Sequence, residues 1–380
     1  MAESSTAGAG PVKVGVIADQ TGPLSIMGLA NANVARMVVG DINAKGGLLG
    51  RHVELILEDG ATDDAVAAAR AAKLVEDDHV DVVFGGIYSS TRQAIKAPVV
   101  TEGGTLYIYP EQYEGHESDP LIFCTGPVPA QQVDPFLPWL MRETGAKTFY
   151  LPSGDYIWPH VLNAHVRRVV TANGGTIVGE EYFLLDHVDY RSTVEKIAAT
   201  GADVVFNTIV PPGLGPFFEQ LHDSGFTSRG GQLVCTYFDE NLLALFPAEQ
   251  VEGLYGCLDY YQTAGDPFSK KLLDQYDALY PRGAKFTGGS ACSGLYRGLR
   301  LWAVAVTEAG TLDEDEVVAA LDHAELVEGP GGPAAMVPGE HHVRMNMYIA
   351  QARGGRFEIV ENLGAIDPQE PLDETPVLTA

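Results

Sequence analysis

Short apolar runs alternate along the chain with longer stretches in which apolar residues recur at helical spacing. The runs expected to form the first strands are rich in apolar and β-branched residues and lie at 12–18, 53–58, 82–84 and 106–109. A helix expected over 30–44 ends at Gly46 and Gly47, and Asp63 or Asp64 can cap the helix after the second strand. This strict alternation predicts a parallel sheet with helices on both faces.

A turn-rich segment at 124–129, CTGPVP, interrupts the pattern, which then resumes. The further strands are expected at 148–152, 176–183, 204–210 and 231–237, and the further helices at 135–144, 163–172, 191–200 and 217–223. Because this second block is as long as the first, the sequence predicts two similar α/β lobes with parallel sheets. Three helices are then expected at 269–280, 290–309 and 314–324, followed by a two-stranded hairpin at 343–355 and 357–360.

Polar and aromatic side chains follow two neighbouring strands of the first block. Tyr88, Ser89 and Ser90 come after the third apolar run, and Tyr109 and Pro110 end the fourth. Ligands of open α/β sheets bind outside the carboxyl ends of the strands. A helix N-terminus with serine hydroxyls suits a carbonyl or carboxylate oxygen, and tyrosines add flat walls with a polar tip. The stretch predicts a pocket for a small polar ligand; the alternative is that the two serines only cap the helix.

The charge of the chain narrows the classes of partner. Its 380 residues carry a formal net charge of −27, which argues against nucleic acid and against an anionic membrane surface. No apolar run approaches the roughly 20 residues of a membrane span. The N-terminus lacks the basic and apolar regions of a signal peptide. Two expectations stay open: a chain that is cytoplasmic as written, or a mature form that is periplasmic or tethered to a membrane outside the cytoplasm.

Few residues suggest chemistry or metal binding. The four cysteines, which form no C-x-x-C pair, are Cys124, Cys235, Cys257 and Cys292. This spacing predicts single buried thiols, with one long-range disulfide as the alternative. His341 and His342 are adjacent, and neighbouring side chains of a strand point to opposite faces, so we expect a structural role rather than a metal site. No dinucleotide fingerprint follows the first strand and no nucleophile elbow occurs, so no catalytic residue and no cofactor are expected.

Several segments together resemble a known family. They are YSSTR at 88–92, IYPEQYEGHE at 108–117 and GDYIWP at 154–159, with GVI, TGP and INAKGGLLGR at 15–17, 21–23 and 42–51. Over about residues 12–360 the chain resembles the type I periplasmic binding proteins, and within them the Leu/Ile/Val-binding branch. It is most similar there to the amide and urea binders, which comprise the amide sensor of aliphatic amidase operons and the binding proteins of urea ABC transporters.

This resemblance implies two Rossmann-like lobes that are joined by three crossovers and close on a small ligand. It implies a first lobe of 12–127 and 258–330 and a second lobe of 128–257 and 331–365, with 1–11 and 366–380 expected to be flexible. The pocket positions that it implies are Tyr88, Ser90 and Tyr109 in the first lobe and Tyr156, Trp158 and Val210 in the second. An amide carbonyl would accept from Ser90 and nearby backbone N–H groups, while the aromatic faces exclude bulkier ligands.

Three features depart from the pattern of the amide and urea binders. Glu111 and Gln112 stand where those proteins tend to have small or less polar residues. Glu111 can accept from an amide nitrogen, pair with a ligand ammonium or face solvent. Trp158 replaces a commoner tyrosine and removes a hydroxyl acceptor, and Pro211-Pro212 is unusual after Val210. These departures leave the identity of the ligand open.

The expected function is therefore reversible binding of a short-chain amide, urea or related polar solute, without catalysis. Closure of the lobes would be the state that a partner recognises. That partner is an ABC transporter permease if the protein is exported, or a transcription antitermination regulator of an amidase operon if it is cytoplasmic; a homodimer is a further option. The alternative function is a receptor for branched-chain or other amino acids, in which Glu111 holds the ammonium. An α/β enzyme is a remoter alternative.

Overall fold

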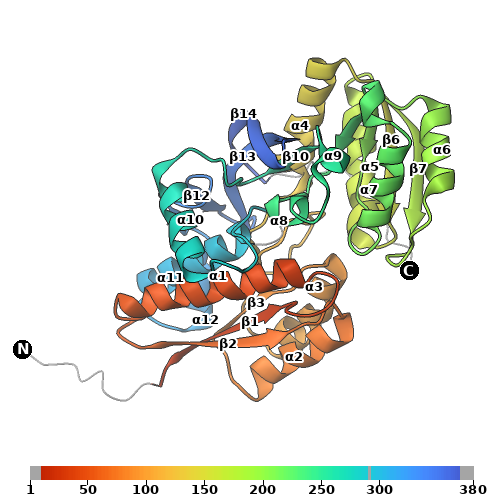
Figure 1. The fold of residues 1–380 in the computed structure, drawn as a ribbon. Coiled ribbons are helices and arrows are strands. Elements are labelled where there is room, and N and C mark those ends of the chain that lie inside the picture. Colours follow the sequence, from red (N-terminus) through yellow and green to blue (C-terminus); the bar gives the residue numbers. More distant parts are fainter. Residues whose placement is uncertain (1–9, 290–291, 369–380) are drawn as a thin grey trace, which may run out of the picture.

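The computed structural model describes residues 10–289 and 292–368 (Figure 1). The first block consists of β1 (Val12–Ala18), α1 (Ser25–Ala44), β2 (Val53–Asp59), α2 (Asp64–Glu76), β3 (Val82–Gly85), α3 (Ser89–Lys96), the π-helical turn η1 (Ala97–Glu102), β4 (Tyr107–Tyr109) and β5 (Ile122–Cys124). The second block consists of α4 (Pro129–Thr144), β6 (Thr148–Gly154), α5 (Ile157–Ala172), β7 (Thr176–Phe183), α6 (Arg191–Thr200), β8 (Val204–Phe206), α7 (Leu214–Asp223), the 3-10 turn η2 (Thr227–Arg229), β9 (Gln232–Val234), α8 (Glu240–Leu243), α9 (Ala248–Val251) and β10 (Tyr255–Leu258). The last elements are α10 (Pro267–Leu279), α11 (Ser293–Ala309), α12 (Glu314–Leu321), β11 (Glu325–Leu326), β12 (Ala334–Val337), β13 (His342–Arg353) and β14 (Arg356–Ile366).

The strands form one mostly parallel sheet in two parts, in the order β2-β1-β3-β4-β5-β13-β10-β9-β8-β6-β7. β13 connects the two parts. It pairs with β5 through His342 and Cys124 and runs antiparallel to β10 from Tyr255 to Leu258. Figure 1 shows β1, β2 and β3 with α1, α2 and α3 in its lower half, and β6 and β7 with α5, α6 and α7 at upper right. The α/β fold class predicted from the sequence is confirmed.

Both faces of the first part of the sheet are buried, as its continuous apolar strands predict. Val16 and Phe84 point to one face and belong to the larger apolar core. Ile17 and Val83, one position away on each strand, belong to a second core on the other face. Gly85 ends β3 at φ 118°, where a Cβ would lie 1.9 Å from the carbonyl oxygen of Ile17, so only glycine permits this turn. The chain leaves the sheet here toward α3.

Some element boundaries differ from the prediction. α1 begins at Ser25, before the expected start at residue 30. Tyr88 is the N-cap of α3, without a side-chain cap hydrogen bond, so the expected capping by Ser89 and Ser90 is wrong. Ser89 already lies inside the helix, and its hydroxyl donates to Glu114 instead.

The end of the last strand and the cap of α2 can be compared with the prediction, whereas parts of both chain ends cannot. β14 extends to Ile366, the first residue of the tail that was expected to be flexible. The rest of that tail beyond 368, the leader at 1–9 and the expected helix start at 290–291 lie outside the described residues. Asp63 caps α2 by accepting from the backbone N–H of Val66 at 2.9 Å, as one of the two predicted alternatives. The residue limits of the two lobes stay a prediction.

Candidate ligand-binding site

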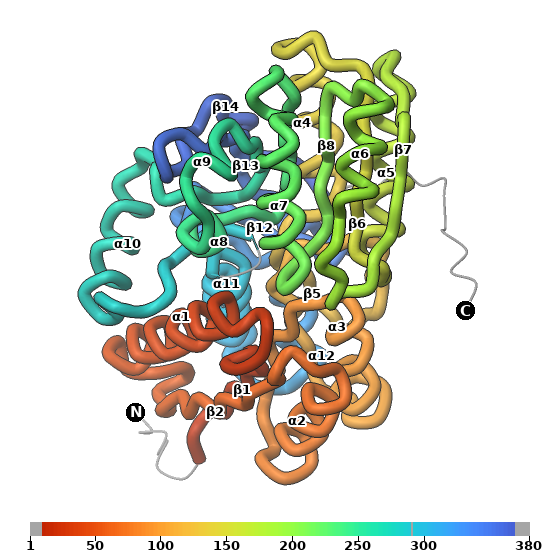
Figure 2. The backbone as a smooth tube through the Cα atoms, turned by 45° about the vertical axis from the view of Figure 1, so that its right-hand side comes forward, coloured from red at the N-terminus to blue at the C-terminus, as the bar shows by residue number. Residues whose placement is uncertain are grey.

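A cleft lies where strand ends of the two blocks meet. Figure 2 shows α3 at the upper side of the first block, close to the ends of β6 and β7. The space between its lining atoms is about 400 Å³ when open solvent is included, and the part of it that the centre of a water-sized sphere can occupy is about 30 Å³. Among the described residues it is lined by Leu24, Met27, Ile87, Tyr88, Ser89 and Gln112 from the first block and by Tyr156, Trp158, Val210, Pro211 and Tyr237 from the second. Strand ends from both blocks therefore supply its walls, as expected for an α/β fold.

Five of the nine predicted site residues line this cleft: Tyr88, Ser89, Tyr156, Trp158 and Val210. The other four, Ser90, Tyr109, Pro110 and Glu111, are described but are not among the lining residues. Tyr109 is fully buried, and its hydroxyl donates to the carbonyl oxygen of Ile87 at 2.7 Å. This hydrogen bond holds the loop before α3 in place. Glu111 is 1% exposed and accepts from Asn31 Nδ2 at 3.1 Å, so it does not face solvent.

Aromatic rings form a continuous wall across the cleft. The ring centroids of Tyr88 and Tyr156 are 5.3 Å apart, and those of Tyr156 and Trp158 are 6.3 Å apart. Tyr237 packs edge-on against Trp158 at 5.8 Å. Tyr88 also donates through its hydroxyl to the carbonyl oxygen of Pro211 at 3.3 Å, which joins the two blocks directly. Burial raises the pKa of Tyr88, Tyr156 and Tyr237, so all three are neutral phenols at neutral pH.

Two lining residues, Trp158 and Gln112, carry N–H groups that no described residue accepts. The indole Nε1 of Trp158 is buried and has no hydrogen-bond partner within the described part of the chain. Gln132 Nε2 donates to the backbone carbonyl of Cys257 at 2.8 Å and to Gln112 Oε1 at 2.9 Å. Because a carbonyl can only accept, this fixes the orientation of both amides, and the NH2 group of Gln112 makes no hydrogen bond to another described residue. Both donors can therefore serve a ligand oxygen.

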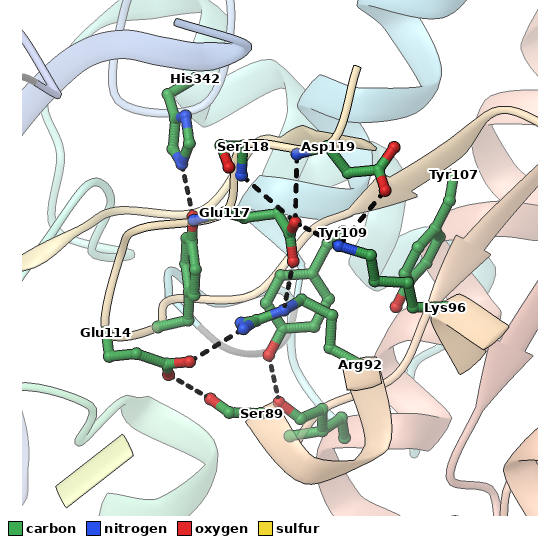
Figure 3. A network of polar contacts seen from close by, with 12 residues as sticks. Ser89, Arg92, Lys96, Tyr107, Tyr109, Glu114, Glu117, Ser118, Asp119 and His342 are labelled. Atoms are coloured by element: carbon green, nitrogen blue, oxygen red, sulfur yellow. Dashed lines mark hydrogen bonds and ion pairs between the residues drawn. The ribbon is translucent and has the colours of Figure 1, made fainter. Parts of the chain in front are cut away.

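A buried ion-pair network adjoins Ser89 on the first-block side of the cleft, and Figure 3 shows its side chains. Ser89 donates to Glu114 Oε2, and Arg92 Nη2 pairs with Glu114 Oε1 at 2.9 Å. Arg92 Nε lies 3.3 Å from Glu117, which in turn pairs with Lys96 at 2.8 Å. The guanidinium of Arg92 also lies over the rings of Tyr109 and Tyr113, 5.2 and 4.5 Å from their centroids. Burial alone would lower the pKa of Arg92, but Glu114 and its other neighbours raise it, so the guanidinium stays charged.

Comparison with known proteins supplies the family. A model described as periplasmic binding protein matches residues 11–356. The chain belongs to the periplasmic binding protein family. Family and fold are those of solute-binding receptors, which supports the expectation that the chain is not an enzyme.

Curated relatives of this family member are amino-acid binders by name. The Leu/Ile/Val-binding protein of Escherichia coli (strain K12) is 34% identical over 235 residues, which are 60% of this chain and 63% of that protein. An amino acid binding protein of Pseudomonas aeruginosa is 26% identical over 246 residues, 59% of this chain and 61% of that protein. The chain thus spans about three fifths of the length of these two relatives. Neither name refers to amides or urea.

Solved structures share the fold over nearly the whole chain. A solute-binding protein of an ABC transporter from Rhodopseudomonas palustris, in complex with 4-hydroxybenzoate, has a TM-score of 0.83 and 21% identity and covers 95% of this chain and 98% of its own. A branched-chain amino acid transporter substrate binding protein from Streptococcus pneumoniae, in complex with isoleucine, has a TM-score of 0.81 and 20% identity and covers 94% of this chain and 99% of its own. At these identities the likeness shows the fold alone.

Sequence reasoning missed six of the lining residues: Leu24, Met27, Ile87, Gln112, Pro211 and Tyr237. Tyr237 ended a predicted strand, and Pro211 followed another, so position at a strand end was the signal that could have found them. Gln112 stood out as a departure from the resemblance without being assigned to the pocket. No pattern in the sequence marks Leu24 or Met27, because their place in the cleft depends on how α1 packs over the sheet.

The sites set aside from the sequence have structural explanations here. No group of three or more His, Cys, Asp or Glu among the described residues could hold a metal ion. His341 stacks on Phe123 with ring centroids 4.1 Å apart, and His342 is hydrogen-bonded to Tyr113. All four cysteines are buried and free, so the expectation of single thiols is confirmed. In the part of the chain that is described, no helix has the length and apolar character needed to span a membrane.

Proposed function

We propose that this chain is the solute-binding component of an ABC transporter and that its cleft captures a small, uncharged polar solute such as a short-chain amide or urea. The observation that carries this proposal is the chemistry of the lining. Among the described residues that line the cleft there is no Asp, Glu, Lys, Arg or His. A charged ligand taken out of water needs a partner of opposite charge, whereas an amide needs only hydrogen bonds.

The polar groups suit an amide. The NH2 group of Gln112 and the indole N–H of Trp158 are donors for a ligand carbonyl oxygen. The N-terminus of α3 adds backbone N–H groups that have no carbonyl within the helix to accept them. Ser89 supplies an acceptor for the amide nitrogen. The four aromatic side chains limit the thickness of the ligand, so a planar group fits best.

A carboxylate solute is the second candidate. The solved relatives described above bind 4-hydroxybenzoate and isoleucine, and a helix N-terminus such as that of α3 can hold a carboxylate. An amino acid further needs an acceptor for its ammonium. Glu111, the residue expected for this role, is bound to Asn31 and is not among the lining residues, which weakens the amino-acid alternative.

Matched pairs of ligands separate these candidates. A thermal-shift series would compare acetamide with acetate, propionamide with propionate and benzamide with benzoate, and would include urea, leucine and isoleucine. A ligand that binds only the folded state raises the melting temperature by an amount that grows with the logarithm of its concentration relative to Kd, so all compounds are compared at one concentration. Shifts with amides or urea but not with their carboxylates support the proposal. Shifts confined to the carboxylates or amino acids refute the ligand class and leave the receptor function standing.

The partner is tested separately. On the transporter proposal, the ligand that shifts the melting temperature also contracts the protein in small-angle X-ray scattering, because closure brings the lobes together. Binding of the closed form to a membrane permease encoded with it would identify an ABC transporter. Binding instead to a transcription antitermination protein would identify the amide-sensor alternative.

A further inference from the structure

Glu114 belongs to the segment IYPEQYEGHE at 108–117, but it is not among the residues that line the cleft. It accepts a hydrogen bond from Ser89, which is a lining residue. One oxygen of the Glu114 carboxylate accepts a hydrogen bond from the hydroxyl of Ser89, and the other accepts one from the guanidinium of Arg92 (Figure 3). Ser89, Arg92 and Glu114 are 3%, 3% and 4% exposed, so water does not compete for these hydrogen bonds.

The direction of the hydrogen bond from Ser89 follows from its partner. A serine hydroxyl has one proton to donate and two lone pairs to accept with. A carboxylate in an ion pair accepts only, so the proton of Ser89 must point to Glu114. The Oγ of Ser89 then has only lone pairs left for any further partner. The hydroxyl of a serine without such a partner can rotate to direct its proton or a lone pair at the ligand. The hydroxyl of Ser89 cannot donate to a ligand without breaking its hydrogen bond to Glu114.

We propose that Glu114 is a specificity-determining residue that acts through Ser89: by holding the serine proton, it makes the cleft select ligands with an N–H donor at that point and reject the matching carboxylates. This inference rests on the proposed function and deepens it, because it assigns the discrimination between amide and carboxylate to one hydrogen bond. A ligand carboxylate oxygen beside Ser89 finds no proton to accept there and is repelled by the lone pairs of the serine oxygen. An amide N–H instead donates to Ser89, which in turn donates to Glu114, and Glu114 is paired with Arg92.

The test compares affinities for benzamide and benzoate, and for propionamide and propionate, by isothermal titration calorimetry of the whole chain. We expect the wild-type protein to prefer each amide. Glu114→Gln can donate its own amide proton to Ser89 and so frees the serine proton for the ligand. This variant is expected to reduce the amide-to-carboxylate affinity ratio roughly tenfold, the size of one hydrogen bond.

Four further variants separate an effect on ligand specificity from an effect on folding. Glu117→Gln removes the other carboxylate beside Arg92 without touching Ser89, and it is expected to leave the ratio within about twofold even if the melting temperature falls. Ser89→Ala, which does not disturb the ion pair, is expected to lower the ratio as Glu114→Gln does. Ser90→Ala, at the neighbouring position outside the lining, is its matched control and should change neither affinity by more than about twofold. Glu114→Gln added to Ser89→Ala is expected to have no further effect on the ratio, because both act on one hydrogen bond.

Each outcome decides the matter. Equal effects of Glu114→Gln and Glu117→Gln on the ratio, or an unchanged ratio in Ser89→Ala, overturn the inference while the amide proposal stands. A third outcome is that amino acids bind and amides do not, and that only Glu114→Gln and Ser89→Ala lower the affinity for them. This result refutes the amide proposal and upholds the selection of an N–H donor. Tighter binding of the carboxylates with no response to Glu114→Gln overturns both, as does the absence of binding by every compound.

Discussion

The two sides of the cleft are built from different interactions. On the first-block side, Ser89 is backed by a buried ion-pair network, and its orientation is set by charge. On the second-block side, Trp158 and Tyr237 are held by the packing of their rings. Electrostatic positioning is directional, whereas ring packing specifies shape. One wall of the cleft is therefore suited to recognise the polarity of a ligand, and the other is suited to recognise its shape.

The largest expected effect comes from breaking the charged side. Arg92→Ala leaves Glu114 and Glu117 buried beside one another without their shared cation, which should lower the free energy of unfolding by about 3–5 kcal/mol. Urea denaturation at 25 °C measures this change. Lys96→Ala is the control, because its ammonium is partly exposed and its loss should cost less than about 1 kcal/mol. Equal losses in both variants would mean that the network is not organised around Arg92.

The next effect concerns the aromatic side. Trp158→Phe keeps a flat ring but removes the buried N–H that has no partner among the described residues. We expect the affinity for the ligand to fall about tenfold through loss of one hydrogen bond, with a smaller change in melting temperature. Tyr237→Phe is the control, because its hydroxyl already donates to the carbonyl oxygen of Ile209. Undiminished affinity in Trp158→Phe would remove the indole N–H from the ligand contacts.

A pH experiment contrasts the paired carboxylates with Glu240, which forms no ion pair recorded within residues 10–289 and 292–368. In α8, Glu240 accepts from the backbone N–H of Gln262 at 2.7 Å, and burial, with a smaller contribution from Asp239, raises its pKa to about 8. The folded chain therefore holds a proton there that the unfolded chain releases above its ordinary pKa of 4.5.

Stability is accordingly expected to fall as the pH rises from about 5 to 8, by more than about 1 kcal/mol. Urea titrations across this range measure it, and Glu240→Gln should flatten the dependence. A stability that rises with pH in this range, or the same slope in the variant, would contradict the assignment.

The smallest expected effect is at the contact between the two sides. Tyr88→Phe removes the hydrogen bond from its hydroxyl to the carbonyl of Pro211, which at 3.3 Å is long. This hydrogen bond joins the two blocks, so its loss should weaken the closed form to which the ligand is bound. Ligand affinity should fall by a factor of about two to five, because a neutral hydrogen bond of this kind contributes less than about 1 kcal/mol. Tyr156→Phe keeps the same ring contact and loses no hydrogen bond to a described residue, so it serves as the control. Calorimetry of the two variants side by side gives the difference.

Much of the fold could be predicted from the sequence because its strands are continuous apolar runs and its helices have clear ends. Asp63 as a helix cap and Gly46 and Gly47 at the end of the first helix are local signals, and they act within a few residues. Boundaries such as the start of α1 at Ser25 could not be predicted, because the apolar face that extends the helix there is defined only by what packs on it.

The site could be predicted in part for similar reasons. Tyr88, Tyr156 and Val210 stand at strand ends, and a parallel sheet brings such ends to one edge. Both Ser89 and Ser90 were expected in the site, and only Ser89 is among the described lining residues. One residue turns a helix by about 100°, so two neighbouring helical residues face different ways, which no pattern in so short a segment resolves. Glu111 and Tyr109 lie in or next to an irregular loop, where sequence does not tell which side chains face inward. Their burial is decided by α1 and by the packing of α3.

The shared strand β13 has a consequence for biogenesis. It is the element that pairs with both β5 and β10, and it spans His342–Arg353, near the end of the chain. A ribosome delivers this segment only after almost all other strands have emerged. The pairings of β13 with β5 and with β10 therefore have to follow the synthesis of all strands from β1 to β10, so both are postponed to one late, common event. The order of translation thus makes β13 the segment whose arrival joins the β5 end of the sheet to the β10 end.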